Sequence, residues 1–326
     1  MRFGVIGTNF VTDWFVAAGK CCDKFALDTV YSRDIKRAHE YAKNHGAAHA
    51  TDSLHELAGR ADVDAVYIAS PTSLHYAHAA AMLKAKKHVL CEKPITSNLA
   101  ELHSLLEIAK SHNVCIMEAM RPAYVPGHNE LKNLIKEIGT VRQATLSFCQ
   151  YSSRYDMFRA GQLPNAFNPD FSNGALMDLG VYTAHVMLRL FGEPKNIQSA
   201  CVKLPGGIDG AGIIIASYDD MFVNLRYSKI SGRENVSEIQ GEDGSIYFDE
   251  FLKLSRLKVS LRKGIEPKNI VVPTHEHDMV YEIDAFIRMA NDPEQMQKEN
   301  YFSIETMRIL DEARKQNSII FPADKA

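Results

Sequence analysis

The amino-acid sequence predicts an α/β fold: a doubly wound parallel sheet, followed by an α+β domain with a mostly antiparallel open sheet. In the first 120 residues, near-continuous apolar segments such as 63–69 alternate with helical segments, which is typical of parallel strands covered on both faces. Between residues 196 and 273, strand-like segments instead follow one another through short turns. The length of 326 residues is twice that of an ordinary domain, so we expect two domains, 1–120 and 121–326.

The first domain is expected to alternate strands with helices. Asp34 lies near the start of one helix, and Gly46 lies where a left-handed cap would end the same helix. Right-handed crossovers then give the doubly wound arrangement. The expected strands are 2–7, 26–31, 47–50, 63–69, 86–91 and 114–118, and the expected helices are 10–22, 34–44, 53–59, 74–85 and 98–111.

The second domain does not continue the regular alternation of strands and helices. Its longest helix should end at Gly192, with Pro194 just beyond it as a stop signal, and Asp219-Asp220 supply a hairpin turn. We expect the amphipathic helix 303–316 to pack on the first domain or at the seam between the domains. The other expected elements are helices 126–137, 174–191 and 276–290, strand 140–150 and an irregular segment over 151–173.

The composition excludes several classes of function. Thirty-seven Lys and Arg against forty Asp and Glu leave no basic excess, so we expect no nucleic-acid partner. The N-terminus does not read as a signal peptide, and no apolar run is long enough to span a bilayer, so we expect no membrane partner. The six cysteines form no C-x-x-C pair, which favours reduced thiols and a cytoplasmic protein. His275 and His277 lack a third ligand at workable spacing, so we expect no metal site.

The first strand leads into a helix through Gly7, Thr8, Asn9 and Phe10. A helix N-terminus at this first turn of a Rossmann-type sheet offers free N–H groups to a phosphate, as in dinucleotide-binding proteins. Only the first glycine of the G-x-G-x-x-G fingerprint is present, and Asn9, which tolerates positive φ, is expected to replace the second.

The second strand ends at Ser32 and Arg33, with Arg37 one helical turn further on. Dinucleotide enzymes that use NAD usually place an acidic residue here for the ribose hydroxyl, whereas an Arg suits the 2′-phosphate of NADP. We therefore expect NADP, with NAD still possible because Asp34 could bind the ribose.

Two further strands end in segments that face the expected ligand crevice. One ends in Ser70-Pro71-Thr72 and the next in Glu92-Lys93-Pro94. Lys93, on a short rigid loop, would present a fixed cation to a cofactor or substrate. We predict a cis Lys93–Pro94 peptide bond, because the lysine must turn sharply into the crevice.

From residue 2 to about residue 316 the sequence resembles the Gfo/Idh/MocA oxidoreductases, the glucose-fructose oxidoreductase and inositol dehydrogenase family. EKP at 92–94 resembles the family's catalytic-lysine loop, and SPTSLH at 70–75 its cofactor-contacting turn, which ends in a histidine. MEAMRPAYVPG at 117–127 resembles the crossing into the substrate domain, and NGALMDLGVYTAH at 173–185 the substrate-domain helix. The tyrosine in that helix, together with Ser-Arg after the second strand, is closest to the dihydrodiol dehydrogenase and glucose-fructose oxidoreductase branches, which use NADP.

The resemblance implies a dehydrogenase or reductase that acts on CH–OH groups of a sugar, polyol or cyclic diol, and a homodimer or homotetramer joined through the open faces of the second sheet. The alternatives are an NAD-dependent inositol-type dehydrogenase and a non-catalytic dinucleotide sensor. The implied catalytic residues are Lys93, Asp178 and Tyr182, and the expected cofactor-binding residues are Gly7, Thr8, Asn9, Phe10, Ser32, Arg33, Arg37, Ser70, Pro71, His75, Glu92, Lys93 and Arg121.

The chemistry of alcohol oxidation supports the candidate residues of the second domain independently of the family resemblance. Asp178, Tyr182 and His185 recur at helical spacing, so one helix face should present all three. Oxidation of an alcohol needs a positioned base for the hydroxyl proton, and a nearby Lys93 would favour the phenolate of Tyr182. His185 competes for this role by its intrinsic pKa, but we assign proton transfer to Tyr182 because it lies nearer the helix start. A sensor would not need this combination of residues.

Overall fold

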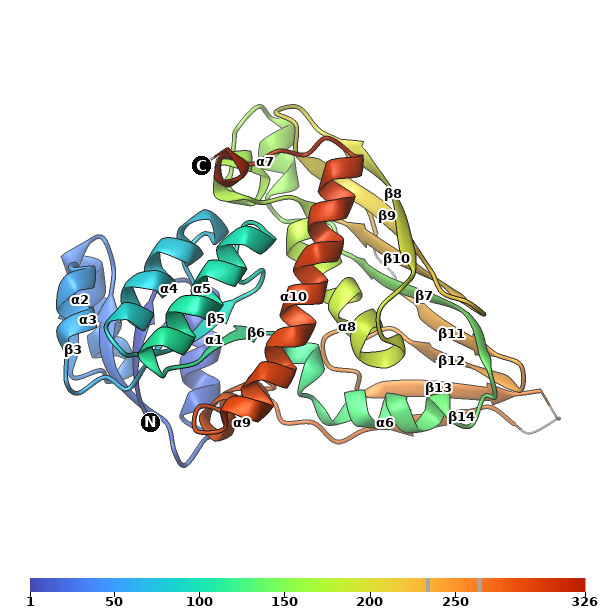
Figure 1. Ribbon diagram of the computed structural model, residues 1–326, viewed down its shortest axis with the longest axis horizontal. Coiled ribbons are helices and arrows are strands. Elements are labelled where there is room, and N and C mark those ends of the chain that lie inside the picture. Colours follow the sequence, from blue (N-terminus) through green and yellow to red (C-terminus); the bar gives the residue numbers. More distant parts are fainter. Residues whose placement is uncertain (233–234, 263–265, 326) are drawn as a thin grey trace. The chain divides into compact units, whose positions relative to one another are not determined.

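The computed structural model describes residues 1–232, 235–262 and 266–325. Contacts divide the chain into two compact units (Figure 1): unit 1 is Met1–Met120 with His275–Ile304, and unit 2 is Arg121–Thr274 with Glu305–Ala326. Residues 275–304, which the sequence analysis places in the second domain, thus pack with the first unit.

Unit 1 is built on a six-stranded sheet in the order β3-β2-β1-β4-β5-β6. Every neighbouring pair of these strands is parallel, so the predicted doubly wound sheet is confirmed. The order reverses between β1 and β4, and ligands of such sheets bind beyond the carboxyl ends of the strands at this point. The strands are β1 (Arg2–Ile6), β2 (Ala26–Tyr31), β3 (His49–Thr51), β4 (Ala65–Ile68), β5 (His88–Glu92) and β6 (Ile116–Ala119).

The helices of unit 1 begin and end where local signals require. Asp34 caps α2 by accepting hydrogen bonds from the N–H groups of Lys36 and Arg37, and Gly46 closes that helix at φ 78°. Aromatic packing explains why α9 belongs to this unit, since Phe286 contacts Phe3 of β1 at 5.9 Å between ring centroids. The helices are α1 (Phe10–Gly19), α2 (Ile35–His45), α3 (Leu54–Gly59), α4 (His75–Lys84), α5 (Leu99–His112), α9 (Val280–Met289) and the first part of α10 (Pro293–Gln316), with the 3₁₀ turn η1 (Thr72–Leu74) before α4.

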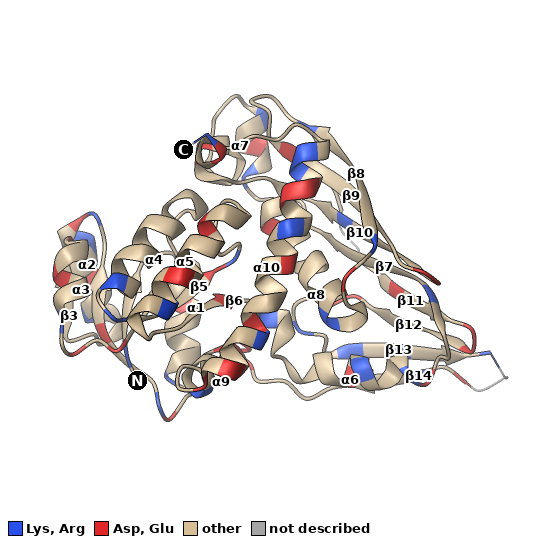
Figure 2. Cartoon of the chain, viewed as in Figure 1, with Lys and Arg blue, Asp and Glu red and all other residues tan. Residues whose placement is uncertain are grey.

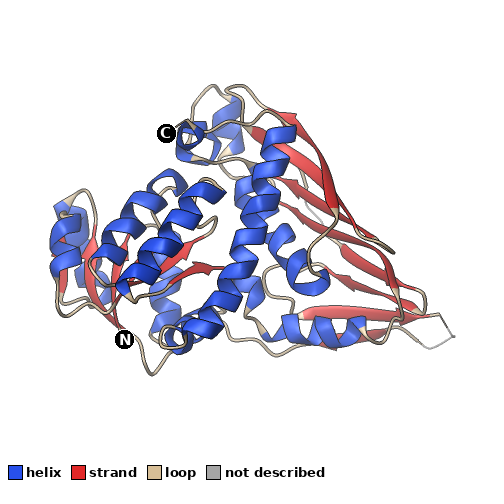
Figure 3. Cartoon of the chain, viewed as in Figure 1, coloured by secondary structure: helices blue, strands red, loops and turns tan. Residues whose placement is uncertain are grey.

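Unit 2 contains an eight-stranded sheet in the order β14-β13-β12-β11-β7-β10-β9-β8. The strands are labelled in Figure 1 and drawn in red in Figure 3. Among the described strands, β7 and β10 pair in parallel and the other neighbours are antiparallel, which confirms the mostly antiparallel sheet. The strands are β7 (Val141–Cys149), β8 (Asn196–Lys203), β9 (Asp209–Ser217), β10 (Phe222–Ser228), β11 (Ser237–Gly241), β12 (Gly244–Phe248), β13 (Arg256–Leu261) and β14 (Lys268–Val271).

Helices cover one face of this second sheet. Inward-facing residues of β10, such as Val223 and Leu225, are completely buried, whereas Phe222 and Arg226 on the alternate positions are exposed. The helical segments of unit 2 are η2 (Arg121–Ala123), α6 (Pro126–Ile135), α7 (Tyr155–Arg159), η3 (Asn165–Phe167), η4 (Pro169–Phe171), η5 (Leu176–Gly180), α8 (Val181–Phe191), the rest of α10 and η6 (Pro322–Asp324).

Two helices differ from their prediction. The helix expected over 174–191 begins with a π-helical turn, η5, before it becomes the α-helix α8. The helix expected over 303–316 begins earlier, at Pro293, because a proline is tolerated in a first turn, where its missing N–H leaves no bond unmade.

Charged side chains are mixed in sign over the fold. Figure 2 shows acidic and basic residues interspersed along helices such as α10. In the described part of the chain, no helix is long and apolar enough to cross a membrane. Because charges of both signs are interspersed, the charged residues that select a ligand are best identified from their local position at the ends of the strands.

Candidate active site

The turn after β1 is fixed by Gly7 and Asn9. Gly7 has φ +119°, and a Cβ on it would lie 2.8 Å from the carbonyl oxygen of Ala69, so only glycine fits. The expected positive φ of Asn9 is wrong: its φ is −104°. The side chain instead caps α1, since Oδ1 accepts from the N–H groups of Val11 and Thr12 at 2.9 and 3.2 Å, while Nδ2 donates to Ala69 O at 2.9 Å. Capping thus takes the place of the missing second glycine.

The predicted basic residues lie beside this turn. Arg37 Nη2 donates to the carbonyl oxygen of Thr8 at 2.7 Å, which joins the start of α2 to the loop before α1. Arg33 and Arg37 are both exposed, and the Asp34 carboxylate is already engaged as the α2 cap. A helix N-terminus beside exposed guanidinium groups fits the phosphates of a dinucleotide. Phe10, 60% exposed, opens α1 at the same place.

His75, one of the predicted cofactor contacts, has both ring nitrogens close to backbone carbonyl oxygens. Its ring is buried, with Nε2 2.8 Å from Ser70 O and Nδ1 2.9 Å from Pro94 O. Burial lowers the pKa of His75, against the opposing effect of these two carbonyl groups. The imidazole therefore connects the turn at Ser70-Pro71 to the Lys93 loop.

The loop that carries Lys93 is held from several sides within unit 1. The Lys93–Pro94 peptide bond is cis, as predicted. Tyr67 Oη donates to Glu92 Oε1 at 2.6 Å, and the N–H of Ile95 donates to Glu118 Oε1 at 3.0 Å. These contacts fix the backbone on both sides of Lys93, whose own side chain is half-buried.

Glu118 is a buried acid that the sequence analysis does not identify. Its second oxygen accepts from Ser303 Oγ at 2.8 Å, so the start of α10 supports the Lys93 loop through this carboxyl group. Burial raises the pKa of Glu118 to about 7, although both hydrogen bonds oppose the shift. Its only signal in the sequence is a glutamate inside an otherwise apolar strand.

In unit 2, Asp178 and Tyr182 lie one turn apart across the junction of η5 and α8. Tyr182 is 7% exposed, and its ring packs edge-on against Phe148 of β7 at 5.5 Å. Asp178 Oδ2 lies 2.9 Å from the ammonium of Lys229, a residue that the sequence analysis misses. The arrangement presents a phenol and an ion-paired carboxylate from one helical segment.

Arg121, predicted to contact the cofactor, is half-buried in η2 of this same unit.

The start of this segment depends on Gly174 and Asp209. Asp209 is completely enclosed, and its Oδ2 accepts from the N–H of Leu176 at 2.7 Å, at the first residue of η5. Burial raises the pKa of Asp209 to about 6, and the hydrogen bond from Leu176 opposes the shift. Gly174 is preceded by Ser172 and Asn173.

Replacing Gly174 with alanine should destabilise unit 2. Gly174 has φ +149°, and a Cβ on it would lie 2.1 Å from Asp209 Oδ1. The Asp209 carboxylate, which accepts from the N–H of Leu176, would therefore have to move. We expect a loss of about 2–4 kcal/mol in the free energy of unfolding. Thermal denaturation measures this, with Gly161→Ala as the control, because Gly161 also has a positive φ but no neighbour within 4 Å. Equal losses in the two variants would show that the contact with Asp209 is unimportant.

His185 has different partners from the other two predicted residues of its helix. Its Nε2 accepts from Arg189 Nε at 2.8 Å, and Nδ1 lies 3.2 Å from Thr306 Oγ1 of α10. Burial lowers the pKa of His185 well below its ordinary value, and the Arg189 charge acts in the same direction. With both nitrogens engaged, the ring packs α8 against α10. The π-helical turn η5 changes the α-helical period between Asp178 and α8, whereas Tyr182 and His185 both lie within α8.

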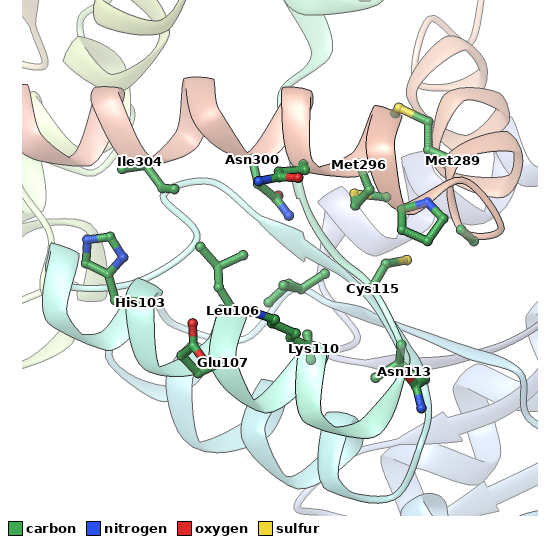
Figure 4. A pocket seen from close by; sticks show the side chains of 16 residues that line it. His103, Leu106, Glu107, Lys110, Asn113, Cys115, Met289, Met296, Asn300 and Ile304 are labelled. Atoms are coloured by element: carbon green, nitrogen blue, oxygen red, sulfur yellow. The ribbon is translucent and has the colours of Figure 1, made fainter.

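A separate cavity of about 600 Å³ lies within unit 1, between α5 and the start of α10 (Figure 4). Leu106, Cys115 and Met296 give it an apolar wall, and Lys110 and Asn300 supply polar groups. None of the predicted site residues lines it.

Among the described residues, no cluster of three or more His, Cys, Asp or Glu side chains could hold a metal ion.

Comparisons with known proteins agree with this architecture. Residues 1–120 match the family model for the Gfo/Idh/MocA "oxidoreductase family, NAD-binding Rossmann fold", and residues 128–247 match the model of its C-terminal domain. Scyllo-inositol 2-dehydrogenase (NADP(+)) IolU of Bacillus subtilis is 44% identical over the full length of both chains. Trans-1,2-dihydrobenzene-1,2-diol dehydrogenase of Danio rerio is 25% identical over 99% of both chains.

Solved structures share the fold. KijD10, a 3-ketoreductase from Actinomadura kijaniata solved with NADP and TDP-benzene, superposes with a TM-score of 0.86 over 97% of both chains at 21% identity. The family models and the full-length relatives together settle the membership. This chain belongs to the Gfo/Idh/MocA family of oxidoreductases, whose first domain is an NAD-binding Rossmann fold.

Proposed function

We propose that the protein is an NADP-dependent dehydrogenase that transfers a hydride between the nicotinamide and a CH–OH carbon of a cyclic polyol, diol or sugar. The observation that carries this proposal is the pairing of a phenol and a carboxylate, Tyr182 and Asp178, one turn apart on the η5–α8 segment. The activities of the inositol and dihydrodiol dehydrogenases named above support the same class of substrate.

Each proposed residue has a distinct role. The bound cofactor supplies the hydride acceptor or donor, according to the direction of reaction. When an alcohol is oxidised, Tyr182 takes the hydroxyl proton and Lys93 donates a hydrogen bond to the substrate oxygen, where negative charge develops. Asp178 accepts a hydrogen bond from a substrate hydroxyl, which favours polyhydroxylated molecules over simple alcohols.

The choice of NADP rests on Ser32, Arg33 and Arg37. Arg33 is exposed, and Arg37 is held beside the first loop by its bond to Thr8 O. Asp34, the alternative ligand for the ribose of NAD, is engaged as the α2 cap. These contacts favour a cofactor that carries the extra phosphate.

Replacing Arg33 with alanine should weaken NADP binding far more than NAD binding. A charge-assisted contact to a phosphate contributes roughly 1.5–3 kcal/mol, so the dissociation constant for NADP should rise about tenfold or more. Titration of both cofactors measures the change, and Arg60→Ala, in the same unit but paired with Asp28 and Asp62, is the control. Equal losses for the two cofactors would show that Arg33 is a general surface charge and would revive the NAD-dependent alternative.

The non-catalytic sensor is the weaker alternative. A sensor has no use for a proton-transfer group, yet Lys93, Asp178 and Tyr182 are all present, and the Lys93 loop is fixed by buried hydrogen bonds. The resemblance, the structure and the relatives together favour an enzyme.

We further propose that the protein forms a homodimer or homotetramer through the outer face of the sheet in unit 2. Val202, Ile215 and Phe222 are 54%, 38% and 40% exposed, and the strand register places all three on this face. Apolar side chains gathered on one face favour burial against a second copy. Light scattering should give a mass of two or four chains, and a single-chain mass would contradict the proposal.

A further inference from the structure

Lys229, the first residue after β10, joins three parts of unit 2. Its ammonium donates to the carbonyl oxygen of Ala166 at 2.8 Å and lies 2.9 Å from Asp178 Oδ2. The same nitrogen stands 5.0 Å from the centre of the Phe167 ring, a distance typical of a cation–π contact. One cation therefore connects a strand end, the segment before η5 and the carboxylate assigned to the substrate.

The two charges of this pair differ in their exposure. The side chain of Lys229 is 4% exposed, whereas that of Asp178 is 36% exposed. A buried ammonium is tolerated only when anions and hydrogen-bond acceptors surround it, so Lys229 depends on Asp178. Conversely, Asp178 can present its carboxylate outward in one orientation because the buried lysine holds Oδ2.

Among the described residues, Asp209 is a further carboxyl group on which the charge of Lys229 acts. Asp209 is completely enclosed, and the charge of Lys229 partly offsets the effect of burial on the pKa of Asp209. Asp209, however, is committed to the N–H of Leu176 at the start of η5. The direct ion-pair partner of Lys229 is therefore Asp178.

We propose that Lys229 is a positioning residue for substrate binding, which holds the Asp178 carboxylate and the Ala166–Phe167 segment in one arrangement toward a polyol hydroxyl. The proposal rests on the function proposed above and assigns a role to part of the irregular 151–173 segment. Lys229 does not touch the substrate itself, because its ammonium is buried. Its effect on the reaction must then pass through Asp178.

A double-mutant cycle tests this dependence. We would measure kcat/KM for cyclic polyols at saturating NADP⁺ in wild type, Lys229→Met, Asp178→Asn and the double variant. Each single variant should lose about 10- to 100-fold, mostly through a higher KM, and the double variant should be little worse than Asp178→Asn. The affinity for NADP⁺ should stay unchanged. Lys195→Met, an exposed lysine paired with Asp219 in the same unit, is the control.

The outcomes separate the two possible roles of Lys229. Losses that multiply in the double variant, or a folded Lys229→Met with wild-type kcat/KM, would overturn the proposal. If Lys229→Met does not fold, as shown by thermal melting, Lys229→Gln retains a donor for Ala166 O and takes its place in the cycle. A wild-type protein that binds NADP⁺ but oxidises no polyol would instead refute the proposed function, and this inference with it.

Discussion

Tyr182→Phe should lower kcat for polyol oxidation by roughly 10²–10⁴-fold, the usual contribution of a general acid–base group. The substitution keeps the ring, which packs against Phe148, and removes only the hydroxyl that would take the substrate proton. NADP⁺ binding should remain near that of wild type, because the phenol belongs to unit 2 and the cofactor turn to unit 1. Steady-state kinetics and cofactor titration on the same preparation measure both quantities.

The matched control is His185→Ala on the same helix. His185 is engaged by Arg189 and Thr306, so its loss should reduce stability by about 1–3 kcal/mol while the folded variant keeps most of its kcat. If the alanine variant were inactive and the phenylalanine variant nearly normal, His185 would be the base and the assignment to Tyr182 would be wrong.

Lys93→Met should lower kcat by roughly 10²–10³-fold, the scale observed when one donor to a developing negative charge is removed. Methionine is similar in length but carries neither a charge nor a donor. The loop should keep its shape, because Tyr67 Oη donates to Glu92 and the N–H of Ile95 donates to Glu118, and neither of these two bonds uses the ammonium of Lys93. The loss should therefore appear in kcat more than in the affinity for NADP⁺.

The control for Lys93 is Lys84→Met, an exposed lysine in the last turn of α4 of the same unit. This variant should match wild type. If Lys93→Met also kept its kcat and only bound NADP⁺ less tightly, Lys93 would be a cofactor contact and not a catalytic residue. The stabilisation of the negative charge that develops on the substrate oxygen would then have to be assigned to another group.

Much of the fold could be predicted because its signals are local. Buried parallel strands have continuous apolar runs, and the α2 boundaries depend on a cap at Asp34 and a left-handed glycine at Gly46. The early start of α10 escaped prediction, because Pro293 reads as a break but is also compatible with a first helical turn. The packing of α9 on β1 depends on contacts between residues distant in sequence, such as Phe3 and Phe286.

The candidate site could be predicted only in part. Motif spacing identifies Lys93, Asp178 and Tyr182, but it cannot show which groups hold them. Lys229 and Glu118 are buried ionisable residues whose partners lie far away in the sequence, and a linear pattern does not reveal these partners. The π-helical turn before α8 likewise has no signature in the sequence, yet it changes the helical period between Asp178 and the residues of α8.

The proposed function of this protein is the NADP-dependent oxidation of a cyclic polyol or a related diol or sugar. The most direct measurement is the formation of reduced nicotinamide when the purified wild-type protein is mixed with NADP⁺ or NAD⁺ and a panel of inositols, cyclic diols and aldoses. We predict turnover of at least one of these compounds, with kcat/KM higher for NADP⁺ than for NAD⁺. Binding of NADP⁺ without turnover of any compound in the panel would contradict the claim.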